Sequence, residues 1–181
     1  MNHLQRRPAR GFTLVEIMVT VAIVGLLSSV AIPQYMRMQF RSRASERLAI
    51  MDAVGRAVRD TVANLQALPD PASPDSWAGA SNPPGAPTAH KRPFVPALGG
   101  WRWLPMIVQG DCYYSYSFVA GRPSASGANA TLTVIALGDL DGDGVPSAKQ
   151  INYQSAGWVF YKVQGAGGEV PPAGYEDTTT F

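Results

Sequence analysis

Cysteine and histidine are nearly absent from this chain of 181 residues. Cys112 is the only cysteine, so no disulfide can form within the chain, and a metal site built from several thiolates is excluded. The histidines are His3, in the N-terminal segment, and His90, so a nucleophilic site with a histidine base would depend on His90 alone. The chain also contains no glycine-rich phosphate-binding loop. These absences predict that the protein is not an enzyme and has no catalytic residue.

Acidic residues are absent from the first 15 positions, where Arg6, Arg7 and Arg10 lie. The whole chain has 15 basic and 13 acidic side chains, a formal net charge of +2. Without these three arginines, 12 basic and 13 acidic side chains remain. The excess of positive charge therefore belongs to the N-terminal segment, and the charge does not indicate a nucleic-acid partner.

Charge is almost absent from Phe12 to Ile32, where Glu16 is the only ionisable side chain. A helix of this length spans about 31 Å, enough to cross the hydrocarbon core of a bilayer. A plain membrane anchor accounts for the length but not for Glu16, which would cost on the order of 2.5–3.5 kcal/mol at the bilayer centre and less near its edge. A secretory signal peptide cut after Ala31 fits neither the length of the run nor the glutamate.

A third interpretation considers the charges together. If the chain is cut after Gly11, the new α-amino group of Phe12 is a cation beside the apolar run. Glu16 follows four residues later, one helical turn away, so each charge can be compensated within the chain or between neighbouring copies. An ionisable residue inside an apolar segment is a functional candidate, and here its partner can be named.

The stretch "GFTLVEIMVTVAIVGLLSSVAIP" resembles the N-terminus of type IV pilins and of the related pseudopilins of type II secretion. The resemblance implies that a prepilin peptidase cuts after Gly11 and N-methylates Phe12. It also implies that Glu16 pairs with the amine of an adjacent subunit during assembly. Gly25 and Pro33 match positions that flank a stretch able to unwind in the filament.

The resemblance further implies a location and a set of partners. The leader, residues 1–11, would lie in the cytoplasm, and the precursor would be a single-pass protein of the inner membrane before it enters an extracellular pilus or a periplasmic pseudopilus. The partners would be other pilin subunits, the prepilin peptidase, and the pilus or secretion assembly machinery. The implied function is that of a structural subunit, a major or minor pilin. The alternatives are a type II secretion pseudopilin and a filament-borne binding subunit, such as one for DNA uptake.

Apolar residues recur at spacings of three and four after Pro33, which indicates one apolar helix face. These residues are Leu48, Met51, Val54, Val58, Val62 and Leu65. We therefore predict one helix from about Phe12 to Gln66, with a transmembrane or filament-core half, 12–34, and an amphipathic half, 35–67. Eight prolines between Leu68 and Pro96 predict a connecting loop over 68–98.

Four runs rich in aromatic and β-branched residues, 101–109, 112–121, 130–138 and 151–163, predict an antiparallel sheet within 99–164. The tail, 165–181, is rich in Gly, Pro and Thr and is predicted to be loosely ordered. The expected fold class is α+β, a pilin fold: a long N-terminal α-helix packed on an antiparallel β-sheet of about four strands.

The motif "GDLDGDGV" places Asp139, Asp141 and Asp143 at alternate positions. This spacing is that of the first half of a calcium-binding EF-hand loop, but the last ligand position holds Gln150 instead of a bidentate glutamate. The other interpretation is a tight Asp-Gly turn in a hairpin, which needs no metal. No cofactor is expected apart from this candidate Ca²⁺.

Overall fold

The computed structural model describes residues 11–123, 130–163 and 169–170. The predicted leader up to Arg10 and nearly all of the predicted tail, 165–181, lie outside these residues. The chain divides into two compact units, which we call the N-terminal unit (1–39) and the C-terminal unit (40–181). Helix α1, Leu14–Leu65, supplies residues to both units.

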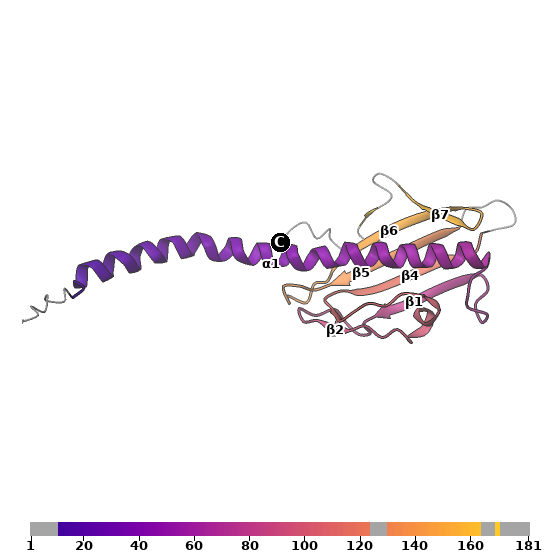
Figure 1. Ribbon diagram of the computed structural model, residues 1–181, viewed down its shortest axis with the longest axis horizontal. Helices are drawn as coiled ribbons and strands as arrows, with labels where there is room; N and C mark the ends of the chain where they lie inside the picture. Colours follow the sequence, from indigo (N-terminus) through magenta and orange to yellow (C-terminus); the bar gives the residue numbers. More distant parts are fainter. Residues whose placement is uncertain (1–10, 124–129, 164–168, 171–181) are drawn as a thin grey trace, which may run out of the picture. The chain divides into compact units, whose positions relative to one another are not determined.

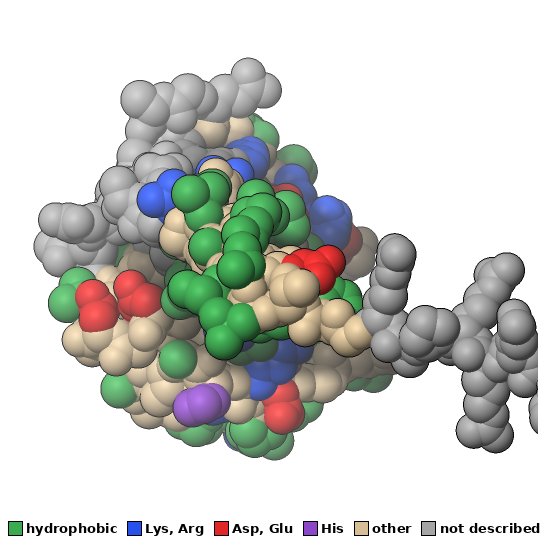
Figure 2. Space-filling model, turned by 90° about the vertical axis from the view of Figure 1, so that its left-hand side faces the viewer, with side chains coloured by type: hydrophobic (Ala, Val, Ile, Leu, Met, Phe, Trp, Pro, Cys, Tyr) green, Lys and Arg blue, Asp and Glu red, His purple; other side chains and the backbone are tan. Residues whose placement is uncertain are grey.

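The described part of the N-terminal unit, residues 11–39, consists mainly of the first part of α1 and carries an apolar surface. All of its described residues are exposed except Ser28, which is half-buried. Figure 2 shows hydrophobic side chains gathered on this part of the helix. Within the described residues, α1 is the helix that is long and apolar enough to cross a membrane. The described residues of this unit therefore form no hydrophobic core of their own.

The C-terminal unit contains an antiparallel sheet with the strand order β1-β4-β5-β6-β7, and β8 pairs with β6. These strands are β1 Ser76–Asn82, β4 Ser115–Gly121, β5 Thr131–Gly138, β6 Ser147–Ala156, β7 Val159–Lys162 and β8 Glu169–Val170. A separate ribbon pairs β2, Arg92–Pro93, with β3, Asp111–Cys112. The second half of α1 crosses one face of the sheet (Figure 1), so the predicted α+β fold is confirmed.

The amphipathic half of α1 packs on the sheet through the predicted apolar face. Met51, Val54, Val58 and Val62 are completely buried, whereas Leu48 and Leu65 at the ends of the predicted face are exposed. The helix ends at Leu65, and the next residue, Gln66, has a φ of 52°, in the left-handed region, while its N–H still donates to Val62 O.

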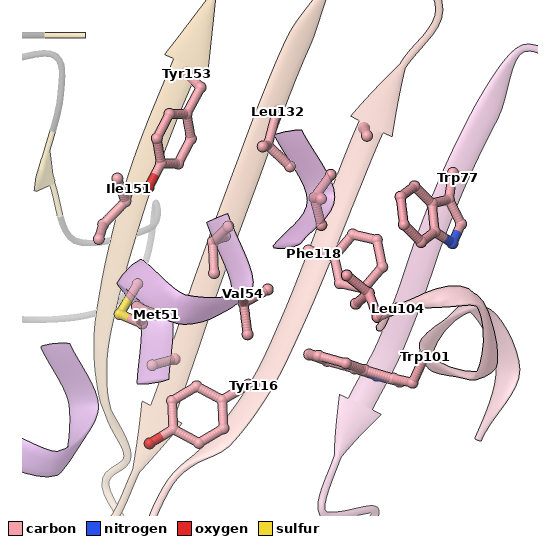
Figure 3. Packing of buried hydrophobic residues seen from close by; sticks show 14 of the residues in the cluster. Met51, Val54, Trp77, Trp101, Leu104, Tyr116, Phe118, Leu132, Ile151 and Tyr153 are labelled. Atoms are coloured by element: carbon pink, nitrogen blue, oxygen red, sulfur yellow. The ribbon is translucent and has the colours of Figure 1, made fainter. Parts of the chain in front are cut away.

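Alternate residues of the strands fill the core under the helix. In β4, Tyr116 and Phe118 point toward the helix, and Leu132 and Ile151 do the same from β5 and β6 (Figure 3). This alternation is the period-2 pattern that the sequence of this region predicted. The sheet therefore has one face that α1 covers and one face turned away from α1.

The 3₁₀-helix η1, Gly99–Trp103, packs beside β1. The Trp77 Nε1–H donates to Gly100 O at 3.0 Å, and the Trp101 Nε1–H donates to Ala80 O at 2.6 Å. A Cβ added to Gly100 would lie 2.8 Å from the carbonyl carbon of Ala78. Glycine at position 100 therefore permits the backbones of η1 and β1 to approach each other closely.

Two strand predictions were wrong. Residues 101–109 form part of η1 and an irregular segment, because Trp101 and Leu104 are buried at a spacing of three and Pro105 has no N–H to pair. Residues 76–82, inside the predicted loop 68–98, form β1. The prolines of that segment flank this stretch but do not enter it, and it occupies an end of the sheet.

The predicted strand 151–163 is two strands joined by a hairpin. The turn residues are Gly157 and Trp158, and Ala156 pairs with Val159. Gly157 has a φ of 63°, which suits the first position of a two-residue hairpin turn. The sequence analysis missed this turn because the apolar and aromatic residues on both sides of Gly157 favour a single strand.

Candidate functional site

The carboxylate of Glu16 takes part in a capping box at the start of α1. The Glu16 N–H donates to Thr13 Oγ1 at 3.3 Å, and the Thr13 N–H donates to Glu16 Oε2 at 3.5 Å. These two bonds satisfy backbone donors that a helix N-terminus leaves without intrahelical partners. They also hold the negative charge at the positive end of the helix dipole. The sequence analysis missed Thr13, although the spacing Thr-x-x-Glu before an apolar run is the signal for such a box.

Gly11 and Gly25 lie where the chain has open space. A Cβ added to either glycine would meet nothing within 4 Å. Neither residue has the positive φ that would require glycine. The packing within the chain therefore gives no reason for glycine at these two positions.

Pro33 lies inside α1, and its ring nitrogen cannot donate the helical bond to Ser29 O. The Ser29 hydroxyl donates to Leu26 O at 2.8 Å, so its side chain is bonded within the same turn. The stretch between Gly25 and Pro33 is helical. It is nevertheless the part of the helix with the weakest propensity, because it contains serine next to a missing hydrogen bond.

The segment around this capping box matches a known family model. The model for the prokaryotic N-terminal methylation motif matches residues 6–32. Over its N-terminal part the chain is also similar to type IV pilins. The capped helix start with Phe12, Thr13 and Glu16 is part of the matched motif.

The chain is similar to several pilins and fimbrial proteins. The type IV major pilin protein PilE1 of Neisseria gonorrhoeae is 36% identical over 84 residues, which are 46% of this chain and 47% of that protein. The type IV major pilin protein PilA of Myxococcus xanthus is 54% identical over 37 residues, 20% of this chain and 17% of that protein. A fimbrial protein of Pseudomonas aeruginosa is 32% identical over 65 residues, 36% of this chain and 42% of that protein.

The chain therefore spans less than half the length of these curated relatives. Their names describe pilins and a fimbrial protein and not enzymes, in agreement with the expectation that the chain is not an enzyme. No solved structure matches the chain.

The three predicted metal ligands come together in the loop between β5 and β6. Asp139, Asp141 and Asp143 each place one carboxylate oxygen within 4.8 Å of the others. Asp139 is buried, and its two oxygens accept hydrogen bonds from Gly142 N at 2.8 Å and Gly144 N at 3.2 Å. We call this loop, residues 139–146, the acidic hairpin.

Gln150, which the sequence aligned with the last ligand position, does not lie in the acidic hairpin. It is part of β6 and pairs with Ile135, three residues along the strand from Ser147. At 3.3 Å per residue this is about 10 Å from the start of β6. The β5–β6 pairing thus favours the Asp-Gly turn, and the three aspartates stay a candidate Ca²⁺ site without the ligand set of an EF-hand.

Proposed function

We propose that the chain is a structural subunit of a type IV pilus, assembled into a filament through the N-terminal part of α1. The observation that carries this proposal is the N-terminal unit itself. It exposes a continuous series of large apolar side chains from Phe12 to Met38, interrupted by few polar ones. A patch of this size marks a surface that a membrane or a partner covers. A membrane before assembly and other copies of the helix afterwards supply that cover.

Under this proposal, prepilin peptidase cuts the chain after Gly11 and methylates Phe12. The fold itself would accept a side chain at position 11, because a Cβ there meets nothing within 4 Å. This supports the idea that the peptidase, and not the fold, requires glycine at this position. The new ammonium group would add positive charge at the positive end of the helix dipole, which is unfavourable without a nearby anion. The Glu16 carboxylate is held at that end by Thr13 and is available to compensate the amine of an adjacent subunit.

We also propose that the stretch from Gly25 to Pro33 unwinds when the subunit enters the filament. The support is local: Pro33 already lacks one helical hydrogen bond and Gly25 lowers helix propensity. The precursor would be stored in the inner membrane with its leader in the cytoplasm. The assembly machinery would then extract it into a filament outside the cell.

Mass spectrometry of the assembled subunit tests the processing step. The expected N-terminus is methylated Phe12, and a substitution Gly11→Val blocks cleavage because a side chain would occupy the space that the peptidase reserves for glycine. Gly25→Ala is the matched control for cleavage, measured on the membrane-bound subunit, since it also adds a Cβ in open space but leaves the residue before the cut unchanged. Assembled subunits that begin at Met1 or at Ile32 would contradict the proposal.

A deletion strain distinguishes the pilus subunit from the alternatives. The pilin names of the relatives favour a pilus, and loss of surface filaments and twitching is the expected result. Loss of protein secretion with filaments intact would instead identify a pseudopilin. Loss of DNA uptake alone would identify a filament-borne binding subunit.

A further inference from the structure

A pocket, which we call the end pocket, lies at the end of the C-terminal unit where α1 ends. It has a volume of about 200 Å³ and lies between the segment that follows α1, the residue that follows β4 and the turn between β6 and β7. In Figure 1 this is the end of the sheet at which β4 and β6 finish. Pockets for drug-sized ligands measure about 300–1,000 Å³, so this one has room for a single ring or one side chain. Its lining includes Leu68, Asp70, Pro71, Pro74, Arg122 and Trp158.

Trp158 gives the end pocket an aromatic wall. It is the second residue of the two-residue turn that Gly157 begins, and such turns are normally built from small or polar residues. The indole is half-buried and packs, like Leu68, against the hydrophobic core. Because it also lines the pocket, part of the ring is available to a ligand. An aromatic face of this kind attracts the C–H groups of a saturated ring.

The loop that forms another part of the wall is held in one conformation. Three prolines within residues 69–74 fix their own backbone φ angles. The Ala72 N–H donates to Asp70 Oδ1 at 3.0 Å, and the Ser73 N–H donates to Asp70 O at 3.2 Å. A ligand that binds to such a loop has little backbone to order, so even a small contact area can give measurable affinity.

One group of each charge lines the end pocket. Asp70 is half-buried, and its carboxylate has acceptor positions besides the one that the Ala72 N–H uses. Arg122 Nη1 lies 3.7 Å from Asp75 Oδ1, and the two side chains are 54% and 85% exposed. Such an exposed ion pair is weak, and a guanidinium has five N–H donors. Arg122 is therefore able to donate to a ligand in the pocket as well.

The two charges together select the kind of ligand. A cation would be repelled by Arg122, and an anion would be repelled by Asp70. A wholly apolar ring would take water from both charged groups without replacing its hydrogen bonds. A neutral ring with hydroxyl groups avoids these penalties, since a hydroxyl group can donate to the Asp70 carboxylate and accept from the Arg122 guanidinium. A hexose combines such hydroxyl groups with an apolar C–H face.

We propose that the end pocket binds one neutral hexose ring. The ring lies on the Trp158 indole, and its hydroxyl groups bond to Asp70 and Arg122. A ligand of about 12 non-hydrogen atoms binds weakly, so a dissociation constant on the order of 1–10 mM is expected. This binding goes beyond the proposed pilus function and does not depend on it. In a filament the end pocket would recur in every copy, and this repetition would raise the affinity for a polysaccharide.

Saturation-transfer NMR of the full chain tests the proposal. The chain is solubilised in lauryldimethylamine oxide, because many other detergents carry sugar head groups that would compete for the pocket. Methyl β-glucopyranoside and methyl β-galactopyranoside are the probes, and at least one of them should bind with a millimolar dissociation constant. Trp158→Ala should weaken that binding about tenfold or more, since it removes the aromatic wall.

Trp103→Ala is the matched control for the loss of an indole. Trp103 is 39% exposed, and the guanidinium carbon of Arg102 lies 5.3 Å from its ring centroid. It therefore offers an accessible indole and a neighbouring cation but does not line the end pocket. Its removal should leave the binding of the two hexosides unchanged.

Two charge variants test the selectivity of the pocket, and they stay informative if Trp158→Ala does not fold, because neither position is in the buried core. Asp70→Asn retains an acceptor for the Ala72 N–H and removes the negative charge. Glucuronate, an anion, should bind to this variant about threefold or more tighter than to the wild type. Arg122→Gln should have the same effect on glucosamine, which is a cation near neutral pH.

Three results would each overturn the inference. Neither hexoside binds at about 50 mM, well above the expected dissociation constant. The two charge variants leave the relative affinities for glucuronate and glucosamine unchanged. Cyclohexanol or phenylalanine binds more tightly than both hexosides, which would identify an apolar pocket or a site for a zwitterion. Each of these results leaves the pilus function intact, and a strain that shows no filaments leaves the end pocket intact.

Discussion

Glu16 has a capping role that the structure shows and a pairing role that we propose, and one substitution can separate them. Its carboxylate accepts a hydrogen bond from the Thr13 N–H at the start of α1, and under the proposed function it also compensates the charge of the Phe12 amine. Glutamine can make the same capping bond but carries no charge. We expect Glu16→Gln to be inserted into the membrane and processed normally but to enter filaments poorly, and we expect the same of Glu16→Ala, because both variants lack the charge.

The complementary variant is Thr13→Ala, which removes the cap and retains the charge. It should lower helix stability by about 0.5–2 kcal/mol and leave assembly largely intact. Quantifying subunits in the sheared filament fraction provides the measurement. If Glu16→Gln filaments form at the wild-type level, capping and not charge is what position 16 contributes.

Cys112 shows how burial alters a single group. Burial, followed by the nearby Glu46 carboxylate, raises the pKa of the Cys112 thiol from 9.0 to about 11. Since the thiolate is the reactive form, a thiol reagent at pH 8 should label the chain in urea and not the native chain. In the unfolded chain the thiol ionises at its ordinary pKa. Its contribution to stability is therefore complete below pH 9 and is lost as the pH rises toward 11.

Urea unfolding of the detergent-solubilised chain at pH 8 and pH 10.5 measures this contribution. The wild-type chain should lose more stability between the two pH values than Cys112→Ala does. Buried tyrosines such as Tyr114 also have a raised pKa and affect both proteins equally. Equal losses in the two chains would contradict the assignment to Cys112.

At the scale of elements, the distance between α1 and the sheet is set by Gly55. An added Cβ would lie 2.8 Å from Tyr153 Cζ and closer still to its hydroxyl. Glycine to alanine within a helix normally stabilises by about 1 kcal/mol. Here Gly55→Ala should instead destabilise by about 1–3 kcal/mol through overpacking.

Thermal unfolding of the solubilised chain gives the sign of this effect. The double variant Gly55→Ala, Tyr153→Phe should recover part of the loss, since the hydroxyl is the atom nearest to the new methyl group. Tyr153→Phe alone provides the reference. A single variant that melts above the wild type would show that helix propensity outweighs the close contact.

The acidic hairpin depends on one aspartate more than on the other two. Asp139 accepts two backbone hydrogen bonds, which satisfy a turn whose Gly142 and Gly144 have φ values of 76° and 84°. Asp139→Ala should cost about 1–3 kcal/mol. Asp141→Ala, at an exposed position, should cost little.

Calcium should leave the melting temperature unchanged if the hairpin is only a turn. A site with a dissociation constant of roughly 10⁻⁴–10⁻³ M would instead add about 0.4–1.4 kcal/mol at 1 mM Ca²⁺. Calorimetry with and without the ion resolves this difference. A calcium-dependent rise that disappears in Asp141→Ala would establish the metal site.

The sequence predicted those elements whose periodicity is strong and missed those that depend on single residues. The spacing of Met51, Val54, Val58 and Val62 identified the buried helix face. β1 was missed because prolines on both sides masked a short proline-free stretch. Trp101 was assigned to a strand because aromatic residues favour strands, whereas its indole bond to Ala80 depends on residues distant in sequence.

For the whole molecule, the division into two units predicts that the C-terminal unit folds alone. Its buried core uses described residues of this unit only, from Arg47 onward. A fragment of residues 40–181 should be soluble and should unfold in one cooperative transition. A broad, non-cooperative melt with exposed hydrophobic surface would contradict this expectation.

The proposed function could be predicted from the sequence because it depends on a short local motif. Gly11, Phe12 and Glu16 lie within six residues, and the family model matches the same segment. The residues on the face of the sheet turned away from α1 could not be predicted from a local motif. Whether Lys149 lies on the helix side or the open side is decided by its pairing with Ala136, and pairing requires the register of two strands.

Under the proposed pilus function, the position of η1 beside β1 would affect how copies of this chain polymerise. An uncovered end strand is a template on which another chain adds a strand, and this route leads to amyloid-like aggregates. In this chain Ala80 O already accepts a hydrogen bond from the Trp101 indole N–H, and Gly100 lies against the carbonyl of Ala78. An added strand would have to displace both contacts. At the other end of the main strand path, β7 is only four residues long and includes Lys162. In a filament, where copies are extremely concentrated, these protected ends would keep growth on the ordered route through α1 and away from irreversible strand addition.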